Sequence, residues 1–303
     1  KILLISFSTN ARKEMEKRLA ERLPNHPTTE MCRTFHSIGL DIFREEVDPS
    51  RSWVVDTTGR LWRKTIRESA KKMGIRLKQQ GLGLTVKTIA AVASMAKTQM
   101  LISAPALRRL GRVEPGLKEL ASEVAGADIA DDVISIIHGA ENIRETTGIE
   151  DAGGHYRFVT FDDMLFTTAH VLRQQDKRER WAQRWTFVMQ DECQYSSLVQ
   201  DESAEALCSA HRNYMVVGDP QQAIYGFRGA SPERMLAFED AWPGATTIVM
   251  NRNYRSGAEV VDVANRIIGK MPPSTIIAPS MVCERKTRAF VGCHEFTDET
   301  SEA

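Results

Sequence analysis

Short apolar runs alternate with amphipathic stretches near the start of the chain. The run at residues 1–8 predicts a buried strand, and the pattern that follows predicts a helix from about residue 11 to residue 23, which ends before Pro24. A short strand through Cys32 then leads into a helix that begins near Phe35. This alternation of strands and helices is typical of a parallel sheet covered by helices.

The pattern changes between residues 49 and 154, where helical periodicity dominates. One stripe places Trp62, Ile66, Ala70 and Met73 on the same helical face, with arginine and lysine residues opposite. Glycine and proline residues interrupt the region at several points. We interpret residues 49–154 as a helical insertion into an α/β domain.

Beyond this region the alternation of strands and helices returns. The predicted elements are a helix at about 161–175, a strand at 185–189, another helix, a strand at 214–217, a helix at 232–239, a strand at 246–250 and a helix at 258–268. A weaker pattern at 289–296 allows one more strand. The sequence therefore predicts an α/β fold with a parallel sheet, without internal repeats.

Composition adds little to this picture. The 303 residues are 42% hydrophobic and 26% charged, and 40 basic residues balance 40 acidic ones, so the net charge permits a nucleic-acid partner without indicating one. No apolar run approaches the roughly 20 residues of a membrane helix, and no signal peptide is recognisable. The five scattered cysteines form no CxxC pair. We expect a reducing, cytoplasmic and nucleoid-associated protein.

Two adjacent carboxylates follow an apolar run. Asp191 and Glu192 come directly after the predicted strand, whose carboxyl end is where α/β proteins bind ligands. An ATPase needs one carboxylate for Mg²⁺ and another to position or deprotonate the attacking water, and we assign these roles to Asp191 and Glu192 respectively. Asp-Glu pairs are common, and residues 201–202 and 298–299 form two more. Only the pair at 191 follows an apolar strand.

A second candidate site is the segment 218–230, which reads GDPQQAIYGFRGA. Here an apolar strand breaks into a turn, and Gln222 could sense a γ-phosphate without trapping the product by charge. Tyr225 and Phe227 beside Arg228 would form a stacking platform with a phosphate contact, as single-strand binders require. On spacing alone, the two aromatic residues fit a hydrophobic core equally well.

The segment 218–230 resembles motif III of the UvrD/Rep/PcrA-type superfamily 1 DNA helicases, G-D-x-x-Q-S-I-Y-x-(aromatic)-R-G-A. It matches nearly every fixed position, with Ala223 in place of the usual Ser. The segment 191–200, DECQYSSLVQ, resembles motif II, D-E-x-Q-D-x-x-x-x-Q. Two positions depart from the family pattern: Tyr195 replaces the usual Asp, and Gln190 stands where an apolar residue is common.

Four further segments resemble family motifs, in the family's order. FSTNARKEMEKR, which starts at Phe7, resembles motif Ia, and the T-F-H-S of residues 34–37 matches motif Ib. FDDML at 161–165 resembles the family's F-D-D-L-L segment, and N-Y-R-S at 253–256 matches motif IV. The order of these segments supports the resemblance seen at motif III.

The resemblance implies a RecA-like parallel-sheet fold of the P-loop NTPase type, with ATP and Mg²⁺ as cofactors. The implied ATP-site residues are Asp191 for Mg²⁺, Glu192 for water, Gln222 and Arg255 for the γ-phosphate, and Tyr254 for the adenine. The implied single-strand contacts are Phe7, Thr34, Phe35, His36, Tyr225, Phe227 and Arg228.

The resemblance also implies a domain layout. Residues 1–48 would begin RecA-like domain 1A, 49–154 would be the 1B-like helical insertion, 155–250 would complete 1A, and 251–303 would hold motif IV and the start of a second RecA-like domain, 2A. The sequence contains neither the phosphate-binding pattern G-x-x-x-x-G-K-[ST] nor motifs V and VI. We therefore expect a fragment that binds ATP weakly and hydrolyses little or none of it alone.

Our leading interpretation is part of an ATP-dependent DNA helicase that moves 3′-to-5′ on single-stranded DNA, acts at single-strand/double-strand junctions and serves replication, repair or recombination. Three alternatives stay open. A nuclease domain beyond this sequence would favour the motor part of a helicase–nuclease. A natural lack of the phosphate-binding loop would favour a catalytically dead module that binds single strands or a protein partner. The motif III segment makes an RNA helicase of the same superfamily the weakest alternative.

Overall fold

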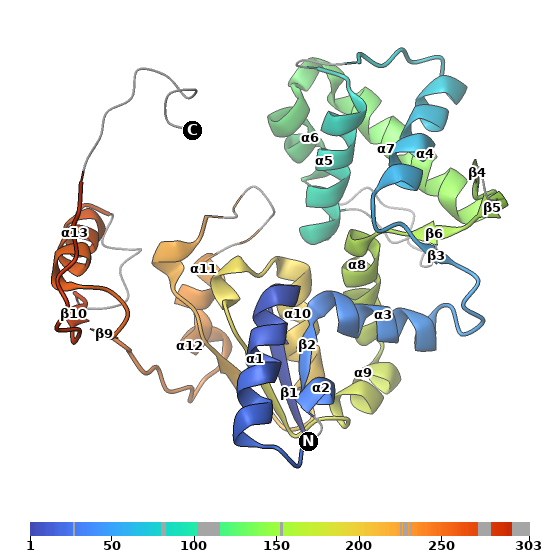
Figure 1. Ribbon diagram of the computed structural model, residues 1–303. Coiled ribbons are helices and arrows are strands. Elements are labelled where there is room, and N and C mark those ends of the chain that lie inside the picture. The colour runs from blue at the N-terminus through green and yellow to red at the C-terminus, as the bar shows by residue number, and fades with distance from the viewer. Residues whose placement is uncertain are drawn as a thin grey trace. The chain divides into compact units, whose positions relative to one another are not determined.

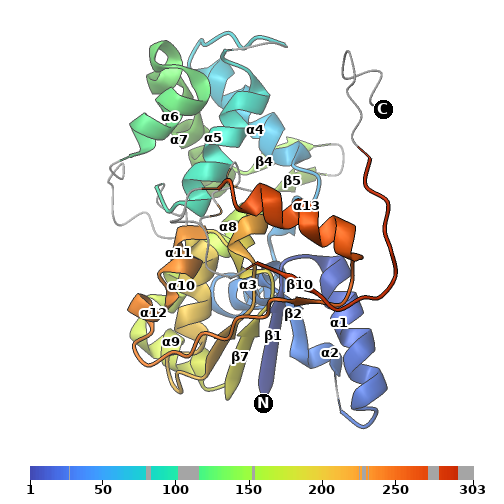
Figure 2. The ribbon, with the colours of Figure 1, turned by 90° about the vertical axis from the view of Figure 1, so that its left-hand side faces the viewer.

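Four parallel strands organise the N-terminal part of the chain (Figures 1 and 2). In sheet order they are β2 (Cys32–Thr34), β1 (Ile2–Ser6), β7 (Phe187–Gln190) and β8 (Tyr214–Val216). Ser6 lies opposite Thr34, Ile5 opposite Gln190, and Gln190 opposite Val216. The carboxyl ends of all four strands therefore meet at one edge of the sheet, and the predicted parallel sheet is confirmed.

The computed structural model describes residues 1–26, 28–79, 83–101, 116–151, 154–224, 226, 230, 232–271 and 280–292. The chain divides into two units. The first unit comprises residues 1–218 and 223–231, and the second comprises residues 219–222 and 232–303. The domain boundaries drawn from the sequence stay predictions.

Six helices surround the sheet in the described part of the first unit. They are α1 (Thr9–Arg22), α2 (Thr28–Met31), α3 (Phe35–Glu46), α8 (Phe161–Leu172), α9 (Gln175–Ala182) and α10 (Leu198–Leu207). Local sequence explains where several begin: the hydroxyl of Ser8 accepts the Ala11 N–H at the start of α1, at 3.1 Å. Helix α8 packs against both α3 and α10. The predicted positions of β1, α1 and α3 are confirmed.

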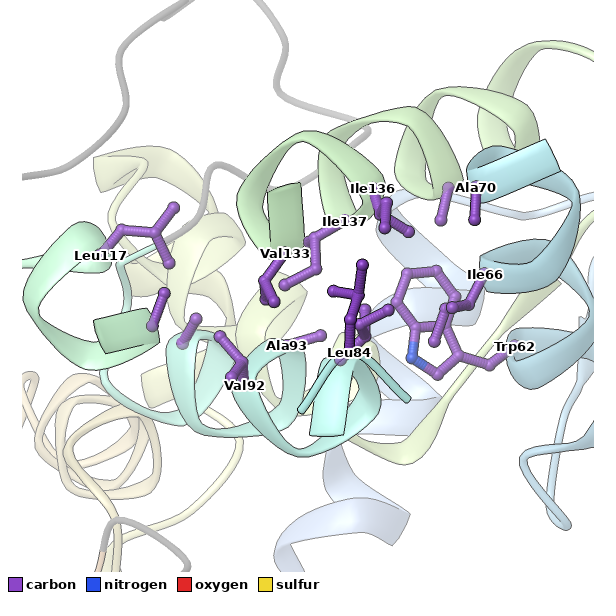
Figure 3. Close-up of a cluster of buried hydrophobic side chains, with 14 of the residues drawn as sticks. Trp62, Ile66, Ala70, Leu84, Val92, Ala93, Leu117, Val133, Ile136 and Ile137 are labelled. Atoms are coloured by element: carbon purple, nitrogen blue, oxygen red, sulfur yellow. The ribbon is translucent and has the colours of Figure 1, made fainter. Parts of the chain in front are cut away.

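A second group of helices in the same unit packs around its own core (Figure 3). It comprises α4 (Arg60–Lys72), α5 (Val86–Thr98), α6 (Leu117–Ala125), the short η2 (Ala127–Ile129) and α7 (Ala130–Thr146). Trp62, Ile66 and Ala70 of the predicted stripe are buried there. Met73 is 43% exposed, because α4 ends at Lys72 and the stripe ends with it.

Short strands join this helical group to the sheet. The chain enters through β3 (Val54–Val55) and returns through β6 (Phe158–Val159), and these two strands pair in parallel. Just before the return, β4 (Ile149–Asp151) and β5 (Gly154–Tyr156) form an antiparallel hairpin. Figures 1 and 2 both show α4–α7 at the opposite end of the unit from β1, and Figure 2 shows the same for β7.

The second unit holds shorter elements. They are η4 (Pro220–Gln222), α11 (Pro232–Leu236), α12 (Phe238–Ala241), β9 (Arg252–Asn253), α13 (Ala258–Ile268) and β10 (Val282–Cys283). Strands β9 and β10 pair in parallel. The helix predicted at 258–268 is confirmed, whereas the one predicted at 232–239 is interrupted at Ala237.

The strand predicted at 246–250 is wrong. These residues have no regular structure, and Ile248 and Met250 are 80% and 78% exposed. An apolar run becomes a strand only beside a pairing partner, and no described strand pairs with this one. Residues 289–292 of the weaker prediction also form no strand, and 293–296 lie outside the described residues. No described helix is both long and apolar enough to span a membrane.

Candidate functional site

The carboxyl edge of the sheet collects predicted site residues from three strands. Phe7 follows β1, His36 lies just beyond β2, and the pair of carboxylates follows β7. The Asp191 N–H donates to the carbonyl of Ile5 at 2.9 Å, which ties the end of β7 to the end of β1. Ligands of parallel α/β sheets bind at this edge. The sheet therefore brings together residues far apart in the sequence.

Glu192 is held in an unusual conformation at this edge. Its backbone is left-handed, with φ 55° and ψ 42°, an arrangement that non-glycine residues rarely adopt outside constrained or functional sites. Gln194 is fully buried, and its Nε2 donates to Glu192 Oε2 at 2.6 Å. The Cys193 N–H donates to the carbonyl of Val217 at 3.0 Å, so the neighbouring strand anchors the turn. The turn therefore contacts the side chain of Glu192 through Gln194 and is itself bonded to the chain just after β8.

Asp191 lies beside Glu192 and is partly buried. Burial raises the pKa of the Asp191 carboxyl, and the adjacent Glu192 raises it further. A cation placed between the two would relieve both effects. The described residues contain no group of three acidic, histidine or cysteine ligands. This donor set fits Mg²⁺, which commonly uses one or two carboxylates and takes its remaining ligands from phosphates and water.

A buried polar cluster next to the turn at Glu192 explains how a glutamine can occupy position 190. The side chain of Gln190 is 2% exposed. Its Oε1 accepts the hydroxyl of Tyr214 at 2.6 Å, and its Nε2 donates to the hydroxyl of Ser196. A buried amide is tolerated when its donor and acceptor both find partners. Gln190 therefore occupies a position usually apolar in the family without an unsatisfied polar group.

The other departure, Tyr195, contacts the predicted single-strand residue of motif Ia. The rings of Tyr195 and Phe7 lie 5.0 Å apart between centroids, with their planes inclined at 52°. This is a favourable geometry for an aromatic pair. Both rings are partly exposed at the carboxyl edge of the sheet. An aromatic surface is therefore present beside the carboxylates.

The three predicted residues of motif Ib occupy different environments. Thr34 caps α3, where its hydroxyl accepts the Ser37 N–H at 3.2 Å, and Phe35 is only 5% exposed in the core. His36 is partly exposed. Burial lowers the pKa of His36, which Asp162 raises only in part, so the ring is neutral at pH 7. Of the three, only His36 is partly exposed.

Two residues of the FDDML segment complete this surface, although the sequence assigned them no role. Phe161 is 42% exposed, and its ring meets that of His36 edge-on at 5.2 Å. Asp162 accepts a hydrogen bond from Ser94 and lies near His36, while burial raises the pKa of its carboxyl. The resemblance of FDDML to a family segment was the one sequence signal that marked them.

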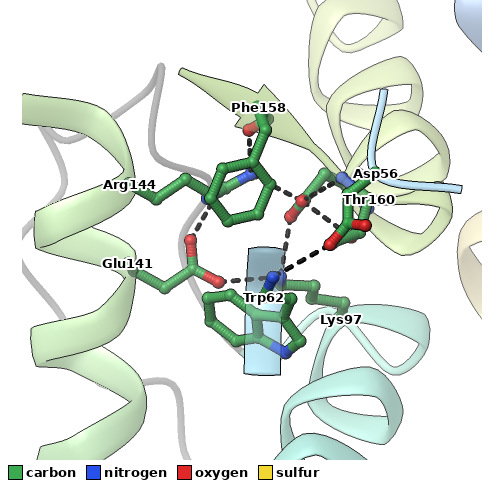
Figure 4. Close-up of polar contacts among 8 residues, drawn as sticks. Asp56, Trp62, Lys97, Glu141, Arg144, Phe158 and Thr160 are labelled. Carbon is green, nitrogen blue, oxygen red and sulfur yellow. Dashed lines mark hydrogen bonds and ion pairs between the residues drawn. The ribbon is translucent and has the colours of Figure 1, made fainter. Parts of the chain in front are cut away.

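The next aspartate belongs to a buried ion cluster, formed by Lys97, Glu141, Arg144 and Asp163 (Figure 4). Each cation contacts both carboxylates at 2.5–2.7 Å, and all four residues are at most 5% exposed. Asp163 also accepts the Thr160 N–H at 2.8 Å. Burial opposes ionisation of Asp163, but Arg144 and Lys97 outweigh it and lower its pKa to about 2. The cluster joins α5 and α7 to α8.

The remaining predicted residues lie elsewhere or outside the described chain. Gln222, in the second unit, donates its Nε2 to Asp219 Oδ2 at 2.7 Å. Tyr254 and Arg255 form an exposed turn, in which Asn253 Oδ1 accepts the Arg255 N–H at 3.0 Å. Tyr225, Phe227 and Arg228 lie outside the described residues.

Comparison with known proteins agrees with the motifs. The UvrD/REP helicase N-terminal domain family matches residues 1–243. The chain is 25% identical, over 272 residues, to proteins called ATP-dependent DNA helicase PcrA from Staphylococcus epidermidis and Staphylococcus aureus. The match covers 88% of this chain and 33% of each relative, so the chain spans about a third of their length. With the sheet edge and its ordered motifs, this match shows that the chain belongs to the UvrD/Rep helicase family.

Proposed function

We propose that this chain supplies the water-activating carboxylate and a single-strand contact surface of an ATP-dependent DNA motor. The observation that carries the proposal is the shared sheet edge, where Asp191 and Glu192 end one strand and Phe7 ends its neighbour. A motor must couple nucleotide hydrolysis to movement along DNA, and this edge places both kinds of residue on one rigid element. The names of the relatives support DNA as the substrate.

In the proposed reaction Glu192 positions the attacking water and accepts its proton. Gln194 holds Oε2, so we assign the water to Oε1. Asp191 would hold Mg²⁺, which when bound neutralises charge on the phosphates. Gln222 and Arg255 would contact the γ-phosphate and Tyr254 the adenine, as the family resemblance implies. In the second unit, Gln222 is hydrogen-bonded to Asp219, and both Tyr254 and Arg255 are exposed.

On the DNA side, the single strand would contact Phe7, His36 and Phe161. Exposed aromatic and imidazole rings stack on bases without regard to sequence, which suits a translocating protein. The family resemblance implies single-strand contacts by Tyr225, Phe227 and Arg228 as well. We propose 3′-to-5′ movement, action at single-strand/double-strand junctions, a nucleoid-associated location and a role in replication, repair or recombination, all on the basis of the family resemblance.

The proposal is tested by titrating this chain into fluorescein-labelled oligo(dT) and following fluorescence anisotropy. We expect binding that Phe7→Ala and Phe161→Ala each weaken about 5- to 150-fold, the equivalent of about 1–3 kcal/mol for one stacked base. Phe187→Ala is the matched control, because Phe187 is 45% exposed but begins β7 at the opposite edge of the sheet. Equal losses in all three variants, or no binding at all, would refute the proposed contact surface.

A parallel measurement follows ATP hydrolysis by the same chain with and without oligo(dT). Because the sequence contains no G-x-x-x-x-G-K-[ST] pattern to hold the phosphates, we expect turnover near background. Strong stimulation by oligo(dT) would show that other residues of this chain hold the phosphates.

A further inference from the structure

One short turn carries both a contact to the catalytic carboxylate and a contact to the single-strand surface. The turn η3 (Cys193–Tyr195) follows Glu192 directly. Its backbone is closed by two hydrogen bonds of 3.0 Å, from the Tyr195 N–H to the carbonyl of Glu192 and from the Ser196 N–H to the carbonyl of Cys193. Within this turn Gln194 holds Glu192, and the next residue, Tyr195, packs on Phe7.

The contact to Phe7 depends on the aromatic ring at position 195. The aspartate usual in the family at this position is too short and too polar to form the ring pair with Phe7. Tyr195 instead places its ring 5.0 Å from that of Phe7, across neighbouring strands β1 and β7. A ligand that restricts the Phe7 ring therefore also restricts the Tyr195 ring.

Glu192 is sensitive to the order of this turn. Its left-handed backbone is maintained by its surroundings, because an unconstrained glutamate would leave that conformation. Its side chain is oriented by Gln194, whose own position depends on the same turn. Loosening the turn would release the backbone and the carboxylate together.

We propose that Tyr195 is a positioning residue through which a single strand stacked on Phe7 orders the turn that holds Glu192. This inference rests on the proposed function, because it takes Phe7 as a single-strand contact. A single strand bound to Phe7 then favours, through Tyr195, the orientation in which Gln194 holds the Glu192 carboxylate. The link requires the tyrosine that replaces the family's usual aspartate.

The test is amide hydrogen exchange of this chain with and without saturating oligo(dT). In the wild-type chain we expect oligo(dT) to slow exchange at the Tyr195 and Ser196 amides by about threefold or more, because local opening of the turn is suppressed. Tyr195→Phe keeps the ring and should keep the slowing. Tyr195→Asp should bind oligo(dT) at saturation yet show no slowing of exchange at the Ser196 amide. Tyr156→Asp introduces the same charge on the distant β4–β5 hairpin and serves as the control.

The outcomes separate this inference from the proposed function. If wild-type protein binds oligo(dT) without slowing exchange at positions 195 and 196, or if Tyr195→Asp shows the same slowing as wild type, the coupling is refuted and the single-strand surface stands. If wild-type protein does not bind oligo(dT), the proposed function fails and the inference with it. Protection of the Ile5 and Val188 amides in β1 and β7 verifies that each variant is folded.

Discussion

The first unit contains two groups of carboxylates. Cations compensate the charges of one group, whereas no described residue provides such compensation in the other. In the buried ion cluster, Asp163 and Glu141 are each contacted by Lys97 and Arg144. At the sheet edge, Asp191 and Glu192 adjoin one another, and neither has an ion pair with a described residue. The pKa of Asp163 is lowered and the pKa of Asp191 is raised.

The difference separates a structural role from the catalytic role that we propose for Asp191 and Glu192. A buried carboxylate paired with buried cations holds the fold together, and its removal leaves unpaired charge inside the protein. A pair of adjacent carboxylates without a cation is a poor arrangement for stability but a ready site for a metal ion and a water molecule. This contrast predicts effects of very different size for substitutions in the two groups.

The largest effect is expected from Glu192→Gln in a form of the protein that hydrolyses ATP. General-base catalysis contributes about 10²- to 10⁴-fold to a rate, so single-strand-stimulated turnover should fall by that factor while ATP binding is kept. Phosphate release and nucleotide binding would be measured in parallel. Glu202→Gln is the control, because Glu202 also follows an aspartate but pairs with Arg173 on the surface. Normal turnover in Glu192→Gln would remove Glu192 as the base.

Arg144→Met should destabilise the first unit by about 3–5 kcal/mol, because it leaves two buried carboxylates with only Lys97. Urea unfolding followed by tryptophan fluorescence measures this, and Trp62 lies 4.5 Å from the Lys97 ammonium. Arg18→Met removes an exposed ion pair with Glu14 and should change stability by less than about 1 kcal/mol. Equal losses of unfolding free energy in the two variants would show that the buried ion cluster contributes no more to stability than an exposed ion pair.

Acid should weaken the buried ion cluster only as the pH falls below about 4, because the folded-state pKa of Asp163 is lowered. The pKa of Asp163 is lowered to about 2 in the folded state, so its contribution is fully present above its unfolded pKa, near 4, and is lost as pH falls through about 2. We expect this group to account for about 2.5 kcal/mol of the difference between neutral and strongly acidic pH. Urea unfolding of wild type and Asp163→Asn between pH 7 and pH 3 isolates this contribution. The difference in unfolding free energy between the two proteins should decrease as the pH falls.

Asp191→Asn should have the smallest effect, and of opposite sign. The folded pKa of Asp191 is raised, so its ionisation favours the unfolded state and lowers stability as pH rises through the folded pKa. Removing the charge should therefore stabilise the unit slightly at pH 7, with no gain below the ordinary aspartate pKa of about 4. Asp131→Asn, at a 77% exposed side chain, is the control. If Asp191→Asn were less stable than wild type at pH 7, burial and the Glu192 charge would not be unfavourable to the ionised Asp191 carboxylate.

Local sequence was sufficient for several elements and for the family. The apolar runs that end in Phe7 and in Asp191 could be recognised because each strand lies buried in the sheet and the polar residues begin where it ends. The helix at 258–268 was likewise predictable from its periodicity. The strand at 246–250 was not, because its formation depends on a partner that the run itself does not specify. The roles of the individual site residues stay predictions.

The sequence by itself determined which family this chain belongs to, the order of its motifs and the ends of its main strands, because these depend on residues adjacent in the chain. Only the tertiary structure decided what neighbouring residues do. Asp162 and Asp163 look equivalent in sequence, yet one lies beside His36 and the other closes a buried ion cluster. Likewise, only the pairing of β1 with β7 brings Tyr195 onto Phe7. Charge compensation and ring contacts depend on packing across distant segments, which local pattern does not encode.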